Sequence, residues 1–245
     1  MSLFTHLRHG LRRSRGAAAL ALAMALAPAG AAMAAEIGED DPLEGINRAF
    51  YDFNRVLDGL ILKPMAMIYR GVLPEEVRGG VRNALDNLRG PVILANDLMQ
   101  GETDRAGVTL KRFVVNTTVG VLGVMDPASG QGLEKHQEDF GQTMAVWGVG
   151  SGPYLFLPLI GPSNPRDAAG LAVDAFVLDP WGHIARAADA DWWPWTRLGI
   201  DIVDTRSRNI EALDDIERNQ LDPYAFIRTT SRQRRASEIA NGRPR

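Results

Sequence analysis

The chain has 245 residues, which is enough for one large domain or two small ones. Its 27 Lys and Arg against 30 Asp and Glu give a net charge of −3, so bulk electrostatics disfavours a nucleic-acid partner. It contains no cysteine, which excludes disulfides, cysteine nucleophiles, thiolate metal sites and a thioether-linked lipid anchor on this sequence.

Residues 1–35 have the layout of a cleaved secretory signal peptide. Four arginines without any acidic residue precede an alanine-rich stretch at 17–27, and Ala32-Met33-Ala34 supplies the small residues of a cleavage site. An uncleaved N-terminal anchor is the alternative. Removal of the segment leaves 23 basic against 30 acidic residues, a net charge of −7. We therefore expect an exported protein.

Helix signals dominate the residues that follow. Asp41-Pro42-Leu43-Glu44 is a capping pattern, and apolar residues behind it recur at helical spacing to Leu57. Pro64 and Pro74 predict the starts of two further helices. The signals that remain in this half are a predicted break at Gly90-Pro91, a fourth helix over 92–100 and a fifth that begins at Thr103.

Two stretches, residues 113–125 and 140–165, carry no charged side chain. Glycines and prolines interrupt the second, so it cannot cross a bilayer as one helix. It lies either beneath the rest of the fold or at membrane depth. Its first residues, up to Trp147, suit either a short helix or a strand. Strands over 144–149 and 154–157 would pair through Gly150-Ser151-Gly152.

Beyond the uncharged stretches the pattern returns to helices. Asn164-Pro165 predicts a helix to residue 178, a long helix follows the tryptophans near residue 193 to about residue 219, and Asp222-Pro223 caps the last. Nothing suggests a large sheet. We predict a mainly α fold with one domain at 36–227, followed by a basic C-terminal helix or tail at 228–245.

The sequence offers little for catalysis. Ser151 lacks the glycines at 149 and 153 that a nucleophile elbow would need. His136, Glu138 and Asp139 could chelate a metal, but a solvated loop is the simpler interpretation. We expect no cofactor, no metal and no enzymatic activity.

Tryptophans gather late in the chain, at Trp192, Trp193 and Trp195. Their rings suit the headgroup layer of a membrane, where tryptophan is enriched. Packing in a helical core is the alternative.

Several motifs, taken together, resemble the MlaA family, also called VacJ. They are Asp41-Pro42-Leu43-Glu44-Gly45-Ile46-Asn47-Arg48, Tyr51-Asp52-Phe53-Asn54, Arg112-Phe113-Val114-Val115-Asn116-Thr117, Asp139-Phe140-Gly141, Gly148-Val149-Gly150-Ser151-Gly152-Pro153-Tyr154 and Arg166-Asp167. They follow the family's order over nearly all of the predicted mature chain.

The resemblance implies a ring-like helical assembly in the inner leaflet of the outer membrane, with an amphipathic central channel. Phospholipids misplaced in the outer leaflet would pass through it to a periplasmic lipid-carrier protein. A trimeric porin is the implied membrane neighbour, and an ATP-driven complex of the inner membrane is the implied onward partner. Alternatives are a soluble periplasmic lipid-binding or adaptor protein and, less well supported, a lipid hydrolase.

The resemblance also implies roles for residues. The expected channel and gating hairpin contains Asn116, Gly120, Gly123 and Asp126, with Gly148 and Gly150 beside it. Phe53 and Asn54 fall in a first-helix motif linked to the channel's resting state. The residues expected to face the membrane are Leu155, Phe156, Leu157, Leu159, Ile160, Trp192, Trp193 and Trp195. Family members commonly carry an acylated N-terminal cysteine, so anchoring of this cysteine-free chain would depend on these apolar side chains.

Overall fold

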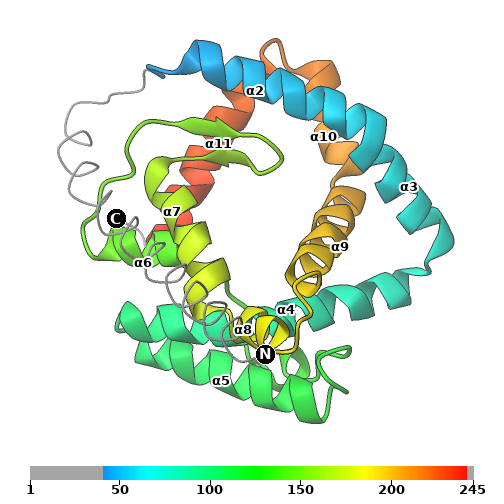
Figure 1. Ribbon diagram of the computed structural model, residues 1–245, viewed down its shortest axis with the longest axis vertical. Coiled ribbons are helices and arrows are strands. Elements are labelled where there is room, and N and C mark those ends of the chain that lie inside the picture. Colours follow the sequence, from blue (N-terminus) through cyan, green and yellow to red (C-terminus); the bar gives the residue numbers. More distant parts are fainter. Residues whose placement is uncertain (1–40, 242–245) are drawn as a thin grey trace, which may run out of the picture.

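The computed structural model describes residues 41–241, and over this range the helices form a ring with one β-hairpin inside its outline (Figure 1). The predicted signal peptide lies outside the described residues. The mainly α class with one short hairpin is confirmed.

The elements follow one another around the ring. In chain order they are α2 (Glu44–Leu57), the π turn η1 (Asp58–Leu62), α3 (Lys63–Val72), α4 (Glu75–Met99), α5 (Thr103–Thr118), the 3₁₀ turn η2 (Ser129–Gln131), α6 (Phe140–Val146), β1 (Leu155–Leu157), β2 (Gly161–Ser163), α7 (Pro165–Val173), the π turn η3 (Asp174–Leu178), α8 (Pro180–Ala187), α9 (Trp193–Arg208), α10 (Ile210–Asn219) and α11 (Pro223–Ile239).

The helix predicted to start at Pro64 is confirmed, since α3 carries this proline in its first turn. The turn η1 joins α3 to α2, and in it the Lys63 N–H bonds to the Asp58 carbonyl. The break predicted at Gly90-Pro91 is wrong. Pro91 lies inside α4, although it removes one helical hydrogen bond. α4 packs along α5, and a Cβ at Gly90 would lie 2.9 Å from Phe113 Cδ2. This packing keeps α4 continuous across the proline.

The hairpin forms one segment later than predicted. Leu155 pairs with Ser163 and Leu157 with Gly161 in an antiparallel register. Of the two alternatives for the residues up to Trp147, the short helix is found and the strand over 144–149 is wrong, because residues 144–146 end α6. The start of α6 is capped by Asp139, which accepts the N–H of Gln142 at 2.9 Å. Gly148, with φ +88°, then ends that helix in the left-handed region.

The later helices differ from the prediction in one place. The single helix expected up to residue 219 is divided into α9 and α10 at Asn209. The last helix, predicted to start at Asp222-Pro223 and to carry the basic tail, is α11, and it contains residues 228–239.

The ring closes where α2 meets α11 and β1. Tyr51, Tyr154, Phe156 and Tyr224 form the small apolar core of this junction. The rings of Tyr51 and Phe156 meet edge-to-face with centroids 5.5 Å apart, and those of Tyr51 and Tyr224 at 5.9 Å. Segments from the two ends of the described chain therefore share one core.

Asn47 joins the elements of this junction through hydrogen bonds. Its Nδ2 donates to the Tyr154 carbonyl and to Asp41 Oδ1, both at 3.0 Å, and its Oδ1 accepts the Phe156 N–H at 2.8 Å. The side chain is only 1% exposed. Asp41 in turn accepts the hydroxyl of Tyr224 on α11. One amide thus connects α2 to the hairpin and, through Asp41, to α11.

We expect Asn47→Ala to lower the free energy of unfolding by about 2 kcal/mol or more, because backbone groups of the hairpin lose their buried partner. Urea unfolding followed by circular dichroism measures this loss. Asn219→Ala, at an exposed residue that ends α10, is the matched control and should change the value little. Equal values for both variants would contradict a special role of Asn47.

Candidate functional site

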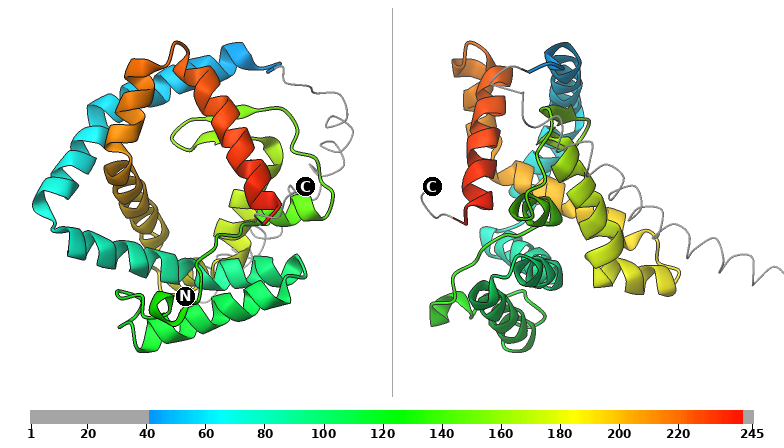
Figure 2. Two further views of the ribbon diagram at one scale, coloured as in Figure 1. Left: turned by 180° about the vertical axis from the view of Figure 1, so that it is seen from behind. Right: turned by 90° about the vertical axis from the view of Figure 1, so that its left-hand side faces the viewer.

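The hairpin lies inside the ring's outline, and its tip is fastened to α2 (Figure 1; Figure 2, left). Asn54 Nδ2 donates to the Leu157 carbonyl at 2.9 Å, and the Leu159 N–H donates to Asn54 Oδ1 at 2.8 Å. Leu159 has φ +67°, a region that disfavours a leucine, so the tip is bent sharply at this point. Phe53, the neighbour of Asn54, is exposed. Both hydrogen bonds at the tip therefore depend on one amide.

The hairpin residues predicted to face a membrane divide into two groups. Leu159 and Ile160 at the tip are exposed, and Leu155 and Leu157 are half-buried. Phe156 is only 5% exposed and packs in the junction core, so its predicted membrane-facing position is wrong. Successive side chains of a strand point to opposite faces, which separates Phe156 from its neighbours.

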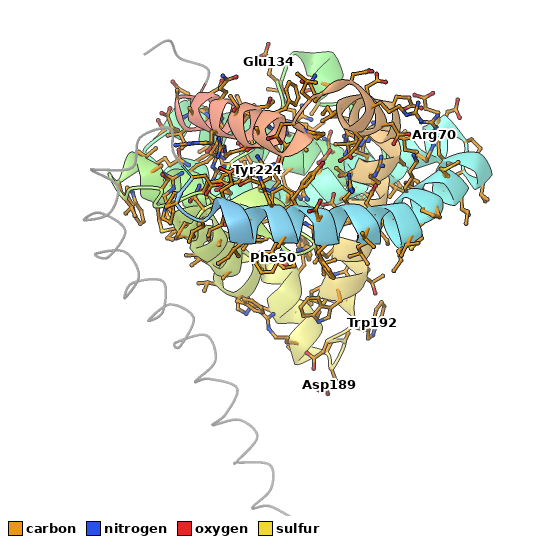
Figure 3. The ribbon with its side chains drawn as sticks, turned by 90° about the horizontal axis from the view of Figure 1, so that it is seen from above. Phe50, Arg70, Glu134, Asp189, Trp192 and Tyr224 are labelled. Carbon is orange, nitrogen blue, oxygen red and sulfur yellow. The ribbon has the colours of Figure 1, made fainter. Side chains whose placement is uncertain are left out.

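The α8–α9 region forms a projection on one side of the ring (yellow in Figure 2, right). Trp192 and Asp189 lie at the narrow end of the molecule in Figure 3, while Tyr224 and Glu134 lie on the opposite side. Trp192 and Trp195 are exposed by 62% and 68%, whereas Trp193 is half-buried against Trp192, with ring centroids 6.1 Å apart. The packing of a helical core therefore does not account for two of the three tryptophans.

Large apolar side chains are exposed over much of the ring. The exposed set on α2, η1 and α3 is Ile46, Phe50, Phe53, Val56, Leu60, Ile61, Met65, Met67, Ile68 and Val72. Contiguous apolar surface of this kind marks an interaction with a membrane, a ligand or a partner. No helix within residues 41–241, however, is both long enough and apolar enough to cross a membrane.

Many of the side chains buried within residues 41–241 are polar or charged. Asn96, Asp97 and Thr143 are completely buried, and Thr143 donates to Asn96 Oδ1 at 2.7 Å. Asp97 accepts the Thr109 hydroxyl at 2.6 Å and lies 3.1 Å from His136 Nε2. Buried polar groups are retained only where they are hydrogen-bonded, and these groups supply one another with partners.

The three residues considered for metal binding have separate partners. His136 faces Asp97, Glu138 pairs with Arg105, and Asp139 pairs with Arg235. Glu138 is only 5% exposed, so the expectation of a solvated loop is wrong for this residue. No group of side chains within residues 41–241 has the arrangement of a metal site.

Arg235 of α11 fastens the starts of α6 and α7. It makes two hydrogen bonds of 2.7 Å to Asp139 and two of 2.9 Å to Asp167. Burial opposes ionisation of Asp139, but the bonds from Arg235 prevail and hold its pKa below the usual range. A Cβ at Gly170 would lie 2.3 Å from the Gly141 nitrogen, so α6 and α7 approach as closely as they do because both residues are glycines.

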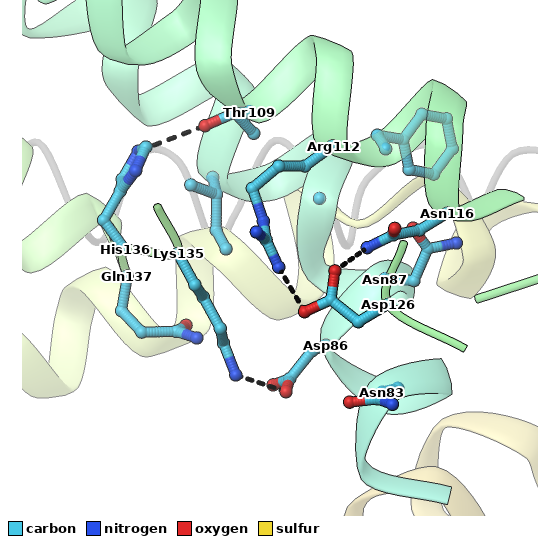
Figure 4. Close-up of a pocket in the computed structure, with 13 residues that line it drawn as sticks. Asn83, Asp86, Asn87, Thr109, Arg112, Asn116, Asp126, Lys135, His136 and Gln137 are labelled. Carbon is cyan, nitrogen blue, oxygen red and sulfur yellow. Dashed lines mark hydrogen bonds and ion pairs between the residues drawn. The ribbon is translucent and has the colours of Figure 1, made fainter. Parts of the chain in front are cut away.

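A small polar pocket lies between α4, α5 and residues 126–137 (Figure 4). Asp126 accepts hydrogen bonds from Asn116 Nδ2 at 2.9 Å and from Arg112 Nη2 at 2.8 Å. Burial opposes ionisation of Asp126, but hydrogen bonds from Ser129, Asn116 and Arg112 outweigh it and lower its pKa to about 2. Lys135 and Asp86 pair across the pocket mouth. The charges are neutralised in pairs, so the pocket serves as a fastening for the turn that joins Asn116 to Asp126.

The structure brings together four of the six residues expected in the gating hairpin. Asn116 and Asp126 bond to each other, and Gly120 and Gly123 lie in the turn between them. Gly148 and Gly150 lie elsewhere. Their neighbour Trp147 donates to the carbonyl of Met99, the last residue of α4, which places them near that end of the helix. That point is about 18 Å along α4 from Asn87, which contacts Gly123. Gly148 and Gly150 lead instead from α6 into the hairpin.

Sequence reasoning missed the function of two asparagines, Asn47 and Asn54, as the partners of the hairpin backbone. The available signal was their spacing of seven residues, which places two amides on one face of α2 next to an uncharged stretch that needs hydrogen-bond partners.

The fold and site define a class of helical ring with apolar side chains outside, polar groups buried within, and a fastened hairpin inside the ring. A family model described as MlaA lipoprotein matches residues 39–238, so the chain belongs to the MlaA family. It is 36% identical over 220 residues to the Intermembrane phospholipid transport system lipoprotein MlaA of Escherichia coli K12, covering 84% of this chain and 80% of that protein.

Two further comparisons agree. The uncharacterized protein RP093 of Rickettsia prowazekii is 32% identical over 199 residues, covering 81% of this chain and 78% of that protein. A solved structure described as "Structural basis for maintenance of bacterial outer membrane lipid asymmetry" matches with a TM-score of 0.73 and 31% identity, covering 82% of this chain and all of that chain. The family assignment is thus supported by both sequence and fold.

The buried carboxyl of Asp174 should make stability depend on pH. It accepts hydrogen bonds from Asn96 Nδ2 and the Phe140 N–H, both at 3.0 Å. Burial, reinforced by the charge of Asp139, raises the pKa of Asp174 from 3.8 to about 6. The folded state therefore holds this proton more tightly than the unfolded state does. The resulting stabilisation is complete below pH 3.8 and is lost as the pH rises through 6.

We expect Asp174→Asn to flatten the pH dependence of the unfolding free energy by about 2 kcal/mol between pH 4 and 7. Urea unfolding at several pH values measures the difference. Asp52→Asn, at an exposed position, is the control. A pH profile of Asp174→Asn parallel to that of the unchanged protein would show that Asp174 titrates normally.

Proposed function

We propose that this protein is an outer-membrane phospholipid transport protein. It removes misplaced phospholipids from the outer leaflet through a passive channel within its ring and passes them to a periplasmic lipid carrier, which maintains lipid asymmetry. The observation that carries the proposal is the inverted polarity of a helical ring, with apolar side chains outside and hydrogen-bonded polar groups inside. Membership of the MlaA family supports it.

The inverted polarity suits a half-inserted ring. Apolar side chains such as Leu60 and Ile68, exposed by 74% and 66%, are unfavourable in water and favourable in hydrocarbon. The buried polar groups already have hydrogen-bond partners within the protein, so they need none from the surrounding lipid. In this proposal, Trp192 and Trp195 at the projecting end, with Leu159 and Ile160, form part of the membrane-facing surface.

A passive conduit needs no nucleophile, and we infer no catalytic role. The proposed partners are phospholipids, a trimeric porin beside the ring in the membrane, the periplasmic carrier, and through it an ATP-driven complex of the inner membrane. A soluble periplasmic lipid-binding protein is the second candidate, and the cysteine-free sequence favours it. Recovery of the protein in the soluble periplasm after gentle lysis would select the second candidate.

Complementation tests the proposal. An Escherichia coli strain that lacks its own MlaA would express this chain, and a membrane-impermeant amine reagent would label phosphatidylethanolamine in the outer leaflet of intact cells. We expect labelling to fall toward the level of the parent strain, and resistance to detergent with chelator to return. A strain that also lacks the periplasmic carrier is the control, in which the chain should give no rescue. Labelling unchanged by a chain that fractionates with the outer membrane would contradict transport.

We expect Asn54→Ala to free the hairpin tip, because both of its hydrogen bonds to α2 are lost. In the complementation assay the unfastened hairpin would leave the ring open to lipid, and labelling of outer-leaflet phosphatidylethanolamine should rise above the level given by the unchanged chain. Asp52→Ala, on the same helix at an exposed position, is the matched control. Labelling that is the same for both variants would show that the hairpin tip does not regulate passage.

A further inference from the structure

The turn after α5 presents an apolar surface. We call residues 119–125 the apolar turn. Two of its seven residues are glycines, and the other five are all exposed, with fractions of 47% to 74%: Val119, Val121, Leu122, Val124 and Met125. The whole stretch from residue 113 to residue 125 carries no charge. A water-facing turn would be expected to carry polar side chains.

The base of the apolar turn is fixed. The Gly123 N–H donates to the Asn116 carbonyl at 2.8 Å, and Asn83 Nδ2 donates to the Val124 carbonyl at 3.2 Å. A Cβ at Gly123 would lie 2.4 Å from Asn87 Cβ, so the turn sits directly on α4. Asp126 and the polar pocket of Figure 4 hold its far end. The turn is therefore held both at its base and at its far end.

Backbone hydrogen bonds inside the apolar turn are largely satisfied. The N–H groups of Leu122, Gly123, Val124 and Met125 donate to carbonyls of residues 116–121 at 2.8–3.2 Å. Those of Val119 and Gly120 donate to the Val115 carbonyl. In water such groups need no internal partner, whereas in hydrocarbon each unsatisfied group is costly. The turn is therefore compatible with hydrocarbon despite being irregular.

Two residues of the apolar turn adopt a conformation that their side chains disfavour. Val121 has φ +53° and Leu122 has φ +57°, in the left-handed region that Gly, Asn and Asp occupy more easily. The chain nevertheless carries a β-branched residue and a leucine there. Local stability does not explain this choice, but a requirement for outward apolar side chains does.

We propose that the apolar turn inserts into the hydrocarbon of a phospholipid bilayer and anchors this part of the ring. This rests on the membrane residence in the proposed function. Lipid is the occupant that fits best, because seven residues are far fewer than the 20–30 per side of a stable protein interface. Acyl chains can surround an apolar surface of any size and need no polar groups on it. The apolar turn has no polar side chain.

The absence of cysteine allows single nitroxide labels at chosen positions. Leu122→Cys and, as control, Glu134→Cys would be labelled, mixed with vesicles of phosphatidylethanolamine and phosphatidylglycerol, and separated by flotation. Glu134 is exposed on the side opposite Trp192 (Figure 3). We expect the label at 122 to collide with oxygen and to be shielded from a water-soluble nickel chelate, and the label at 134 to show the reverse.

Other outcomes overturn the proposal in distinguishable ways. A protein that floats with the vesicles but whose label at 122 meets the nickel chelate is membrane-bound without inserting this turn, and the proposed function stands. A label at 122 shielded from both oxygen and nickel indicates a protein contact in place of lipid. A protein that does not float refutes the membrane residence on which both proposals rest.

Leu122→Asn separates anchoring from folding. Asparagine tolerates positive φ better than leucine, so we expect the Tm to rise by about 2–4 °C while vesicle partitioning falls roughly tenfold. Leu221→Asn is the matched control, since Leu221 is fully exposed between α10 and α11, and its partitioning should not change. A merely structural role for Leu122 predicts a fall in Tm with unchanged partitioning, which would overturn the proposal.

Discussion

Closure of the ring at the junction of α2, β1 and α11 is the constraint on which the remaining structure depends. A ring of single helices gives each helix few neighbours, so the fold cannot rely on one large central core. Closure must bring together segments separated by most of the chain, and the entropy of ordering them has to be overcome at one place. The junction does this with four aromatic rings and the hydrogen bonds of Asn47 and Asp41. If that junction opened, the helices would remain as an arc without a defined interior.

The buried polar groups make physical sense in such a ring. Where the outside is apolar, burial of apolar side chains cannot define the inside, and hydrogen-bonded pairs provide the specificity instead. Arg235 illustrates this, because it holds two carboxylates from two helix starts in one geometry. A buried pair of this kind adds less net stability than its short distances suggest, since desolvation opposes it. It does, however, fix how α6, α7 and α11 meet, which a set of interchangeable apolar contacts would not do.

Local signals predicted most of the helix starts. Asp222 was expected to cap the last helix and accepts the N–H of Ala225, and the helix expected from Asn164-Pro165 begins there, with Asn164 accepting the N–H of Asp167. The capping pattern at Asp41 is wrong, because Leu43 precedes α2 and no side chain caps this helix. Signals failed where distant packing decides. Pro91 was predicted to end a helix, yet contact of Gly90 with Phe113 on α5 keeps α4 whole. The lack of charge marked residues 140–165 as unusual, but it could not distinguish the buried Phe156 from the exposed Ile160. The burial of each side chain depends on which face of the hairpin it points to. Ring closure itself carries no local signature at all.

α2 acts as a template for the hairpin, and the two periodicities match. Asn47 and Asn54 are seven residues apart, which is about 10.5 Å along one helix face. The carbonyls they hold, of Tyr154 and Leu157, are three residues apart, about 10 Å in an extended strand. The strand therefore lies along the helix with an amide at each end. The inner amide belongs to the buried junction, whereas the outer one, Asn54, is half-buried and holds the exposed tip. Because the two attachments are separate, the tip can leave α2 while Asn47 keeps the ring closed, so a moving hairpin and a permanent ring are compatible in one fold.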